Sequence, residues 1–347
     1  MTPEKRFKVP RRPPAPKLSI SDVAREAGVS PTTVSHVLSG KRPVNEVTAA
    51  RVRKVVDRVG YVPASLARSL TRGSTSVIGL LVPDISNTFF AQLAKGVEDS
   101  AHDLGYSVIL CNTEFDSDRE DHYLNLIRSR FIDAMIYAAG SPAPKPRLDA
   151  LLGHFPIALV DEQVDGMESA LTAVADHRAG GRLVGKHLRD LGHTKALLLS
   201  GPQNLRSASE RSAGFREAFS GHVTEVAADF REEAAHTAVA GLLGAGPPQF
   251  TCVFAANDLA AFGVIAALRD AGYAVPQDVS VVGFDDIRAA SLVHPGLTSV
   301  RQPAYDIGRT AAAQLLEYVA AGEIPPASKH ILPVSLVVRG TTDKPRL

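Results

Sequence analysis

Residues 18–60 read LSISDVAREAGVSPTTVSHVLSGKRPVNEVTAARVRKVVDRVG, and their apolar residues are spaced for three short helices. One face of the first helix would be formed by Ile20, Val23, Ala24 and Ala27. Ser19 or Ser21 can cap the start of this helix, and Gly28 ends it at a turn position that needs positive φ. Two helices joined by such a tight turn are typical of a helix-turn-helix motif.

The second and third helices complete a small bundle. Ser30 followed by Pro31 is a favoured start for the second helix. The third helix would be capped by Asn45 and end at Gly60. The apolar residues that these two helices would bury are Val34, Val37, Leu38, Val52, Val55, Val56 and Val59. The spacing favours a helix-turn-helix over a generic three-helix bundle, which remains the alternative.

The second helix leaves a short, neutral, hydrogen-bonding face on its outside. This face consists of Thr32, Thr33, Ser35, His36 and Ser39. Hydroxyls and an imidazole suit base edges in a major groove, and a threonine methyl suits the thymine methyl. The basic residues that flank it can meet phosphates, which position a protein on DNA without specifying sequence: Arg25, Lys41, Arg42, Arg51 and Arg53.

The segment that follows, YVPASLARSLTRGS (61–74), allows a helix of barely two turns after Pro63. So short a helix is marginal on its own in water. Leu66 and Leu70 are spaced i, i+4, and Arg68 lies between them. An apolar wedge beside arginines resembles an insertion into the minor groove, and a plain linker helix is the alternative.

The charge of the chain is unevenly divided. The 347 residues carry a net charge of +1, but residues 1–75 contain 15 Lys+Arg and 5 Asp+Glu, which leaves 23 and 32 for residues 76–347. A head of net charge +10 on a body of −9 favours a nucleic-acid or other anionic partner for the head. The alternative is a solvated basic tail, and for residues 1–17 we expect disorder with weak non-specific DNA contact at most.

The composition is that of a globular protein, with 45% hydrophobic and 22% charged residues. No apolar run approaches the roughly 20 residues that a membrane span needs, and the basic, Pro-rich N-terminus does not resemble a secretory signal. Two cysteines, Cys111 and Cys252, exclude a disulfide framework and a cysteine-built metal site. We therefore expect a cytoplasmic protein without a membrane partner.

After residue 75, short apolar strands alternate with helical stretches. The expected strands are Val77–Val82, Ser107–Cys111, Ala134–Ala138 and Ile157–Val160, then Leu171–Ala175, Ala196–Ser200, Cys252–Ala255 and Val279–Val282. Such strands are typical of parallel sheets covered on both faces. About 270 residues exceed what one sheet holds, so the sequence predicts an α/β body of two doubly wound parallel-sheet lobes behind the all-α head.

Polar and aromatic residues follow several of the expected strands. The candidates are Asp84, Phe89, Phe90, Asp161, Arg211, Phe230, Asn257, Asp258, Asp285, Asp286 and Gln302. Carboxylates and amides bind the hydroxyls of sugars or nucleosides, arginine offers a planar fork, and phenylalanine rings stack on a ligand face. Helix N-capping is the favoured alternative for Asp258 and Asp286, a turn for Asp84 and a core position for Phe89.

Signals for enzymatic chemistry are missing from the sequence. Residues 179–182 (AGGR) and 200–202 (SGP) lack the spacing and the Lys-Ser/Thr of a phosphate-binding loop. No nucleophilic constellation and no cluster of metal ligands stands out, so we expect neither an enzyme nor a cofactor or metal site.

Three long stretches resemble the LacI/GalR family of bacterial regulators: residues 21–52, residues 60–90 and LPVSLVVRGTT (332–342). The head and hinge are most similar to the purine-repressor branch of that family. The resemblance implies a body like that of periplasmic sugar-binding proteins, with a ligand between lobes at the carboxyl ends of the strands. It also implies that the chain crosses between lobes near Arg301 and again near Leu332.

The resemblance also assigns roles in DNA binding. Homodimers of the family place two recognition helices in adjacent major grooves of a palindromic operator. Thr32, Thr33 and His36 would then read bases, with Ser35 and Arg68 as further contacts. Leu70 would lever open a central base step in the minor groove, while Leu66 packs hinge against hinge. Two departures from the family pattern limit how far these roles can be carried over. Pro31 stands where some members have a larger base-contacting side chain, and His36 stands where an arginine is frequent.

For the body, the resemblance implies an effector site. Arg211 and Asp285 would be the strongest contacts, and the remaining ones would be Phe90, Asp161, Phe230, Asn257 and Gln302. The implied domains are a tail (1–17), a DNA-binding head (18–62), a hinge (63–75) and a body (76–347). Within the body, the first lobe would comprise residues 76–171 and 302–331, and the second lobe residues 172–301 and 332–347.

We therefore interpret the chain as a sequence-specific transcriptional regulator, a repressor that binds DNA as a homodimer. A small polar effector, sugar-like or a nucleoside or nucleobase, would control it allosterically. One alternative is a solute-binding receptor, which would share the body but does not account for the head. Another is an α/β enzyme acting on sugars or nucleosides, which would need an acid/base pair or a nucleophile.

Overall fold

The computed structural model describes residues 19–39, 42–61, 74–125, 131–140 and 155–346. The chain divides into two units, Met1–Gly73 and Ser74–Leu347, which are described separately. The tail (1–17) and the hinge residues Leu66, Arg68 and Leu70 lie outside the described residues, so their expected roles remain predictions.

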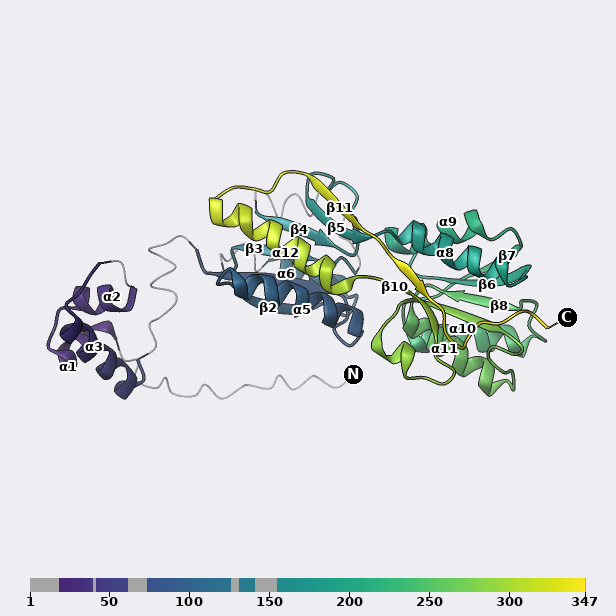
Figure 1. Cartoon of the computed structure of the whole chain (residues 1–347), viewed down its shortest axis with the longest axis horizontal. Coiled ribbons are helices and arrows are strands. Elements are labelled where there is room, and N and C mark those ends of the chain that lie inside the picture. The colour runs from purple at the N-terminus through teal and green to yellow at the C-terminus, as the bar shows by residue number, and fades with distance from the viewer. Residues whose placement is uncertain (1–18, 40–41, 62–73, 126–130, 141–154, 347) are drawn as a thin grey trace, which may run out of the picture. The chain divides into compact units, whose positions relative to one another are not determined.

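The head consists of α1 (Ile20–Ala27), α2 (Pro31–Ser39) and α3 (Glu46–Val59), as its spacing predicts (Figure 1). A capping box between Ser19 and Asp22 starts α1, and the Asn45 side chain accepts a hydrogen bond from the Val47 N–H at the start of α3. Gly28 and Gly60 end the first and third helices, both at φ 64°. A shared apolar core holds the three helices together: Val23, Ala24, Ala27, Val34, Val52 and Val55.

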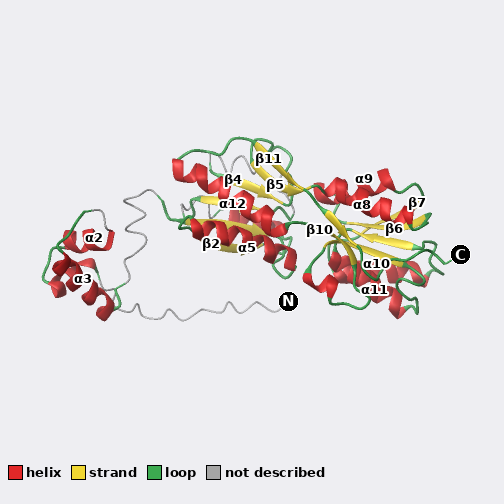
Figure 2. Ribbon diagram, in the orientation of Figure 1, coloured by secondary structure: helices red, strands yellow, loops and turns green. Residues whose placement is uncertain are grey.

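The first lobe of the body is a parallel sheet with strand order β11-β5-β4-β3-β1-β2, covered by helices (Figure 2). Its strands are β1 (Val77–Val82), β2 (Ser107–Asn112), β3 (Ala134–Tyr137), β4 (Ile157–Val160), β5 (Leu171–Ala175) and β11 (Ser328–Leu332). Its helices are α5 (Thr88–Asp103), α6 (Ser117–Leu124) and α12 (Ala304–Ala321).

The second lobe repeats this arrangement with strand order β12-β10-β9-β8-β6-β7. Its strands are β6 (Lys195–Ser200), β7 (His222–Ala227), β8 (Cys252–Ala255), β9 (Ser280–Asp285), β10 (Thr298–Arg301) and β12 (Ser335–Val337), of which β12 alone among these pairs antiparallel. Its helices are α8 (His177–Asp190), α9 (Arg206–Ala218), α10 (Glu232–Gly244), α11 (Asp258–Asp270) and the short 3-10 helix η2 (Arg288–Ser291).

The division between the lobes differs from the expectation at one strand. The sequence predicts that Leu171–Ala175 opens the second lobe, but β5 pairs with β4 and β11 in the first sheet. The chain crosses between β5 and α8, where the Asp176 N–H donates to the Leu332 carbonyl. An apolar run of five residues records that a strand is buried, whereas only its hydrogen-bonded neighbours determine which sheet it joins.

Four strands of the structure were not among the expected ones, namely β7, β10, β11 and β12, and the edge strand β7 lacks an apolar signal. Four of its six residues are exposed and the other two are half-buried, so none belongs to the core. Both cysteines, by contrast, are buried inside strands as expected, Cys111 in β2 and Cys252 in β8. In the described part of the chain, no helix is both long and apolar enough to cross a membrane.

Glycines set the closest helix contacts in both lobes. A Cβ on Gly96 of α5 would lie 2.0 Å from the Tyr305 carbonyl oxygen of α12, and one on Gly308 would lie 2.1 Å from that of Leu93. In the second lobe, a Cβ on Gly181 of α8 would lie 2.1 Å from the Arg211 carbonyl oxygen of α9. The close packing of α8 and α9 therefore positions Arg211 relative to the lobe core.

This contact makes a prediction about stability. Gly181→Ala should lower the free energy of unfolding by about 1–3 kcal/mol, because the new methyl group overpacks the interface between α8 and α9. Gly241→Ala in α10 is the matched control, since its Cβ would meet nothing within 4 Å. That variant should be unchanged or more stable by up to about 1 kcal/mol. Urea unfolding of the full chain measures both, and equal stability of the two variants would contradict the packing argument.

Candidate functional site

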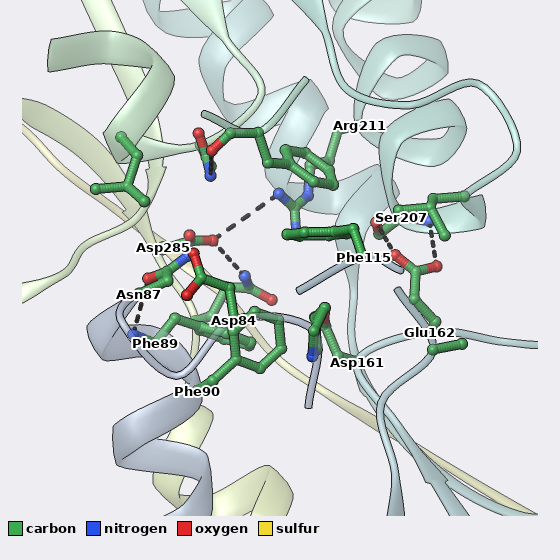
Figure 3. Close-up of a pocket in the computed structure, with 17 residues that line it drawn as sticks. Asp84, Asn87, Phe89, Phe90, Phe115, Asp161, Glu162, Ser207, Arg211 and Asp285 are labelled. Atoms are coloured by element: carbon green, nitrogen blue, oxygen red, sulfur yellow. Dashed lines mark hydrogen bonds and ion pairs between the residues drawn. The ribbon is translucent and has the colours of Figure 1, made fainter. Parts of the chain in front are cut away.

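A cavity lies between the two lobes of the body, at the carboxyl ends of the parallel strands (Figure 3). Its central free volume is about 30 Å³, within a hollow of about 480 Å³ that includes the part open to solvent. The first lobe contributes Pro83, Asp84, Asn87, Phe89, Phe90, Phe115, Ala139, Asp161 and Glu162. The second lobe and the crossover contribute Leu205, Ser207, Arg211, Phe230, Asn257, Leu259, Asp285 and Gln302. All seven residues that the sequence predicts for an effector site line this one cavity.

Arg211 is a buried cation at the centre of the site. It lies on α9 with 4% of its surface exposed, and its Nη1 donates to the Ala256 carbonyl at 2.6 Å. Its guanidinium carbon lies 4.0 Å from the centre of the Phe284 ring and 5.6 Å from that of Phe230. Its Nη1 is 3.9 Å from Oδ1 of Asp285. A buried charge is tolerated only with such partners, so this geometry holds the guanidinium in one orientation.

Two carboxylates face the cavity from opposite lobes, each from the end of a strand. Asp161 follows β4 at φ 63°, and Asp285 ends β9 at φ 111°. Positive φ is strained for residues other than glycine and is found preferentially where a side chain must be aimed at a site. Burial raises the pKa of Asp161 to about 6 and that of Asp285 to about 7, although Arg211 opposes the shift in both.

Amide side chains orient Asp285 and leave acceptors free. Nε2 of Gln302 donates to Oδ1 of Asp285 at 2.7 Å, and the Asn87 side chain also hydrogen-bonds this carboxylate. Oδ1 of Asp161 and Oε1 of Gln302 are buried without a hydrogen-bond partner among the described residues. Buried polar atoms are normally paired, so these two are acceptors available to a ligand.

Glu162 and Ser207 join the lobes at the edge of the cavity. The backbone N–H of Ser207, in the first turn of α9, donates to Oε2 of Glu162 at 3.0 Å, and the Ser207 hydroxyl donates to Oε1. Glu162 is 3% exposed, and burial together with the neighbouring Asp161 raises its pKa to about 8. The carboxyl group of one lobe thus meets the N-terminus of a helix of the other.

Sequence reasoning missed Asn87, Phe115, Glu162 and Ser207. Glu162 directly follows a candidate, Asp161, and Asn87 caps α5 by accepting from the Phe89 N–H at 3.0 Å. A polar residue beside a strand end was therefore available as a signal for Glu162, and the N-cap position before α5 as a signal for Asn87. Phe115 and Ser207 lie in a loop and a first helical turn, where no periodicity marks a residue as facing a ligand.

Asn257 has a structural role besides lining the cavity, and Asp258 and Asp286 differ from the expectation. Asn257 is the N-cap of α11, and its amide Nδ2 also donates to the Phe230 carbonyl at 2.9 Å. Asp258 and Asp286 were expected to cap helices and do not. Asp258 is fully buried and accepts from the Ser299 hydroxyl at 2.5 Å, whereas Asp286 pairs with Arg301 at 2.7 Å and Arg339 at 2.6 Å.

The second candidate site is the outer face of α2 in the head. Thr32 and Ser35 are exposed, and Thr33 and His36 are half-buried. The Thr33 hydroxyl lies 2.9 Å from that of Ser30, so part of its hydrogen-bonding capacity serves the start of the helix. Thr32 and Ser35 are therefore the most accessible polar residues of this face, and its role in DNA binding stays a prediction. Within the described part of the chain, no group of three or more His, Cys, Asp and Glu could hold a metal ion.

Comparisons with known proteins agree with this two-part organisation. The pattern of bacterial regulatory proteins of the lacI family matches residues 19–64, and that of the periplasmic binding protein-like domain matches residues 186–342. The chain is 34% identical to the ribose operon repressor of Halalkalibacterium halodurans over 93% of its own length and 97% of that protein. It is 37% identical to the transcriptional repressor PurR of Photobacterium profundum, and the match covers 87% of this chain and 92% of that protein.

Solved structures show the same similarity. The Lac repressor dimer bound to operator and the anti-inducer ONPF superimposes with a TM-score of 0.82 at 26% identity, covering 94% of this chain and 99% of that one. A LacI family regulator from Enterococcus faecalis with bound ribose has a TM-score of 0.71 at 30% identity, and the match covers 78% of this chain and 100% of that one.

The contact between Glu162 and Ser207 makes the stability of the body depend on pH. Because the pKa of Glu162 is about 8 in the folded protein and near its ordinary 4.5 in the unfolded chain, the folded state holds an extra proton between these values. The contribution of protonated Glu162 to the free energy of unfolding is therefore fully present below pH 4.5 and is lost as the pH rises towards 8. Glu162→Gln is uncharged and can keep both contacts with Ser207. It should melt like the wild type at pH 5 and at least about 2–4 °C higher at pH 8.

The control for this measurement is Glu317→Gln, which changes an exposed carboxylate on α12 and should follow the wild-type melting curve at every pH. Thermal melts of the full chain from pH 5 to pH 9 test the difference. A constant offset between Glu162→Gln and the wild type across this range would show that Glu162 does not titrate in the buried contact.

Proposed function

The chain belongs to the LacI family of bacterial regulatory proteins, and from this premise we propose that it is an operator-binding repressor whose effector binds in the cavity between the lobes. It is a transcriptional regulator with a DNA-binding head and a periplasmic-binding-protein-like body, and not an enzyme. The proposal adds that it acts as a homodimer on a palindromic operator, in the cytoplasm where that DNA lies.

The observation that carries the proposal is the convergence of both lobes on Arg211. Asp161 of the first lobe and Asp285 of the second line one cavity with this guanidinium, and Gln302 joins them from the crossover. A ligand that touches both lobes stabilises one arrangement of the lobes over another. In a dimer, that arrangement sets the spacing of the two hinges, so effector binding and DNA binding become coupled.

The cavity suits a ligand that carries several hydroxyl groups. Free carboxylate and amide oxygens accept from hydroxyls, and the rings of Phe90 and Phe230 can pack on the apolar face of a sugar. Relatives are named for ribose and one solved relative contains ribose. A nucleoside or nucleobase is the second candidate class, because a repressor named PurR is equally similar.

In the head, the face of α2 would read the operator. Thr32, Thr33, Ser35 and His36 offer donors and acceptors of the kind that recognise base edges in the major groove. The hinge roles of Leu66, Arg68 and Leu70 in the minor groove are part of the same proposal and rest on the resemblance. Arg58 and Glu26 form a 2.6 Å ion pair that ties α3 to α1 and supports the orientation of the reading face.

The first-lobe edge strand β2 is the proposed dimer surface. Ile109 and Leu110 are 37% and 42% exposed on this strand, and no strand pairs with its outer edge among the described residues. Unpaired edge strands with apolar side chains favour association with another chain. A second copy of this chain is the proposed occupant, since a structurally similar relative is a dimer bound to its operator.

Operator binding and effector response can be tested together. The operator is first selected from random oligonucleotides with the full chain, and its affinity should fall steeply with salt, as counterion release requires. A panel of sugars and nucleosides is then tested for a change in operator affinity. Arg211→Ala should still bind the operator but lose the response, because the cation that sets the charge and geometry of the cavity is gone.

Arg216→Ala is the matched control for that experiment. Arg216 lies on the same helix but is exposed and pairs with Glu225 at 2.5 Å, away from the cavity. It should respond to the effector like the wild type. A full response in Arg211→Ala would contradict the assignment of the cavity. If the selection yields no operator at all, that result would contradict the proposed function itself.

The dimer surface makes a separate prediction. Leu110→Asp should convert the dimer to a monomer, because a buried, unpaired carboxylate at the interface costs several kcal/mol. Ile331→Asp is the control, since Ile331 is 54% exposed on β11, the other edge strand of the same sheet. Light scattering should give half the wild-type mass for Leu110→Asp alone. A wild-type monomer, or equal effects of both substitutions, would overturn the surface.

A further inference from the structure

The cavity between the lobes contains more acid than base. Asp84, Asp161, Glu162 and Asp285 line it, and Arg211 is the one lysine or arginine among its lining residues. Carboxylates accept hydrogen bonds from the hydroxyls of a neutral sugar, but a surplus of acidic over basic groups favours a cationic ligand over a neutral one. This imbalance is therefore informative about the ligand.

The single cation is already committed to the protein. Nη1 of Arg211 donates to the Ala256 carbonyl at 2.6 Å and lies 3.9 Å from Asp285, while its Nε donates to Nδ1 of His177 at 3.3 Å. Burial and the neighbouring guanidinium lower the pKa of His177 to about 3, so this histidine adds no positive charge. Arg211 acts electrostatically on Asp161, Glu162 and Asp285, but among the described residues it forms an ion pair only with Asp285, so one cation is shared by three buried acids.

Two buried acceptors point to where the missing donors belong. Oδ1 of Asp161 and Oε1 of Gln302 have no hydrogen-bond partner among the described residues, although these side chains are only 9% and 5% exposed. A buried, unpaired carboxylate oxygen is costly, and an ammonium group removes that cost more completely than a hydroxyl does. Asp161 is moreover held at φ 63°, which directs its side chain.

Aromatic rings complete the environment. Four phenylalanines line the cavity together with the carboxylates: Phe89, Phe90, Phe115 and Phe230. Ring faces attract cations, and a combination of carboxylates with aromatic rings is a common way to recognise an ammonium group. The rings of Phe89 and Phe90 meet edge to face, with centroids 5.0 Å apart, so their positions are mutually fixed.

We propose that the cavity takes a hydroxylated amine, such as an amino sugar or imino sugar, with its positively charged nitrogen against Asp161 and its hydroxyls on the remaining acceptors. The inference rests on the proposed function, in which this cavity is the effector site, and narrows the ligand class from polar effectors in general to cationic polyols. Glu162, whose two carboxyl oxygens contact Ser207, contributes less to this preference from the edge of the cavity.

Ligand binding should then release protons. Burial raises the pKa of Asp161 to about 6 and that of Asp285 to about 7, so a bound cation would favour their charged forms. The other charged or titratable groups around them are Arg211 on α9, His177 on α8, Glu162 beside Asp161, Asp258 on α11 and Asp84 after β1. The affinity for a cationic ligand should therefore rise from pH 6 to pH 8, whereas that for a neutral sugar should not.

Matched pairs of probes test this preference on the full chain. D-Ribose is compared with 1,4-dideoxy-1,4-imino-D-ribitol, which keeps three of its hydroxyls and carries a ring nitrogen, and D-glucose with D-glucosamine. Calorimetry should show at least one amino or imino member binding about tenfold or more tightly than its neutral partner. For the imino member, whose secondary amine stays protonated throughout, the affinity should increase from pH 6 to pH 8, with protons released to the buffer.

Variants locate the effect. Asp161→Asn, whose asparagine also tolerates positive φ, should reduce the preference for the charged member about tenfold, and Glu162→Gln should reduce it less. Asp165→Asn is the control, because it removes the same charge from an exposed position in the loop after β4. It should keep the wild-type preference.

The proposal would be overturned if D-ribose and D-glucose both bound as tightly as, or more tightly than, their imino and amino counterparts. It would also be overturned if the chain bound its selected operator but none of the four probes. A preference that survives Asp161→Asn unchanged would also overturn it, because the nitrogen would then not lie against this carboxylate. Failure to bind any selected operator would instead count against the proposed function, whichever ligand the cavity holds.

Discussion

The buried guanidinium of Arg211 is the constraint on which the site depends. Several carboxylates are buried around it, and so many like charges are tolerated only because one fixed cation offsets part of their repulsion. Arg211 can be fixed because α9 packs against α8 without a side chain at Gly181. The packing of α8 on α9 thus fixes Arg211, and the position of Arg211 sets both the charge balance and the geometry of the cavity.

This arrangement also explains how a ligand could act at a distance. The acceptors of the cavity come from strand ends of both lobes, and Glu162 reaches across to Ser207 at the start of α9. Any ligand that pairs with these groups changes the relative stability of lobe arrangements, which is the physical content of an allosteric coupling. The first lobe also carries the exposed edge strand β2, so lobe movement and dimer geometry are mechanically linked in the proposed assembly.

Local signals accounted for most of the fold. The caps at Ser19 and Asn45 and the terminating glycines of the head lie where the sequence predicts them, because capping is a contact between near neighbours in the chain. The observed bounds of β1, β4 and β8 are identical to the expected ones for a related reason, since a continuous apolar run indicates a buried strand from local sequence alone. β7 was missed where such a run is absent.

What the sequence by itself determined is most of the helices and strands, the family and seven of the residues that meet at the cavity. Tertiary structure alone decided that β5 belongs to the first sheet, because strand pairing is a choice among distant partners. It also decided that Asp258 and Asp286 accept buried contacts instead of capping helices. Finally, it placed Glu162 against Ser207 and left Oδ1 of Asp161 without a hydrogen-bond partner among the described residues, since a charge balance exists only once residues far apart in the chain share one enclosed space.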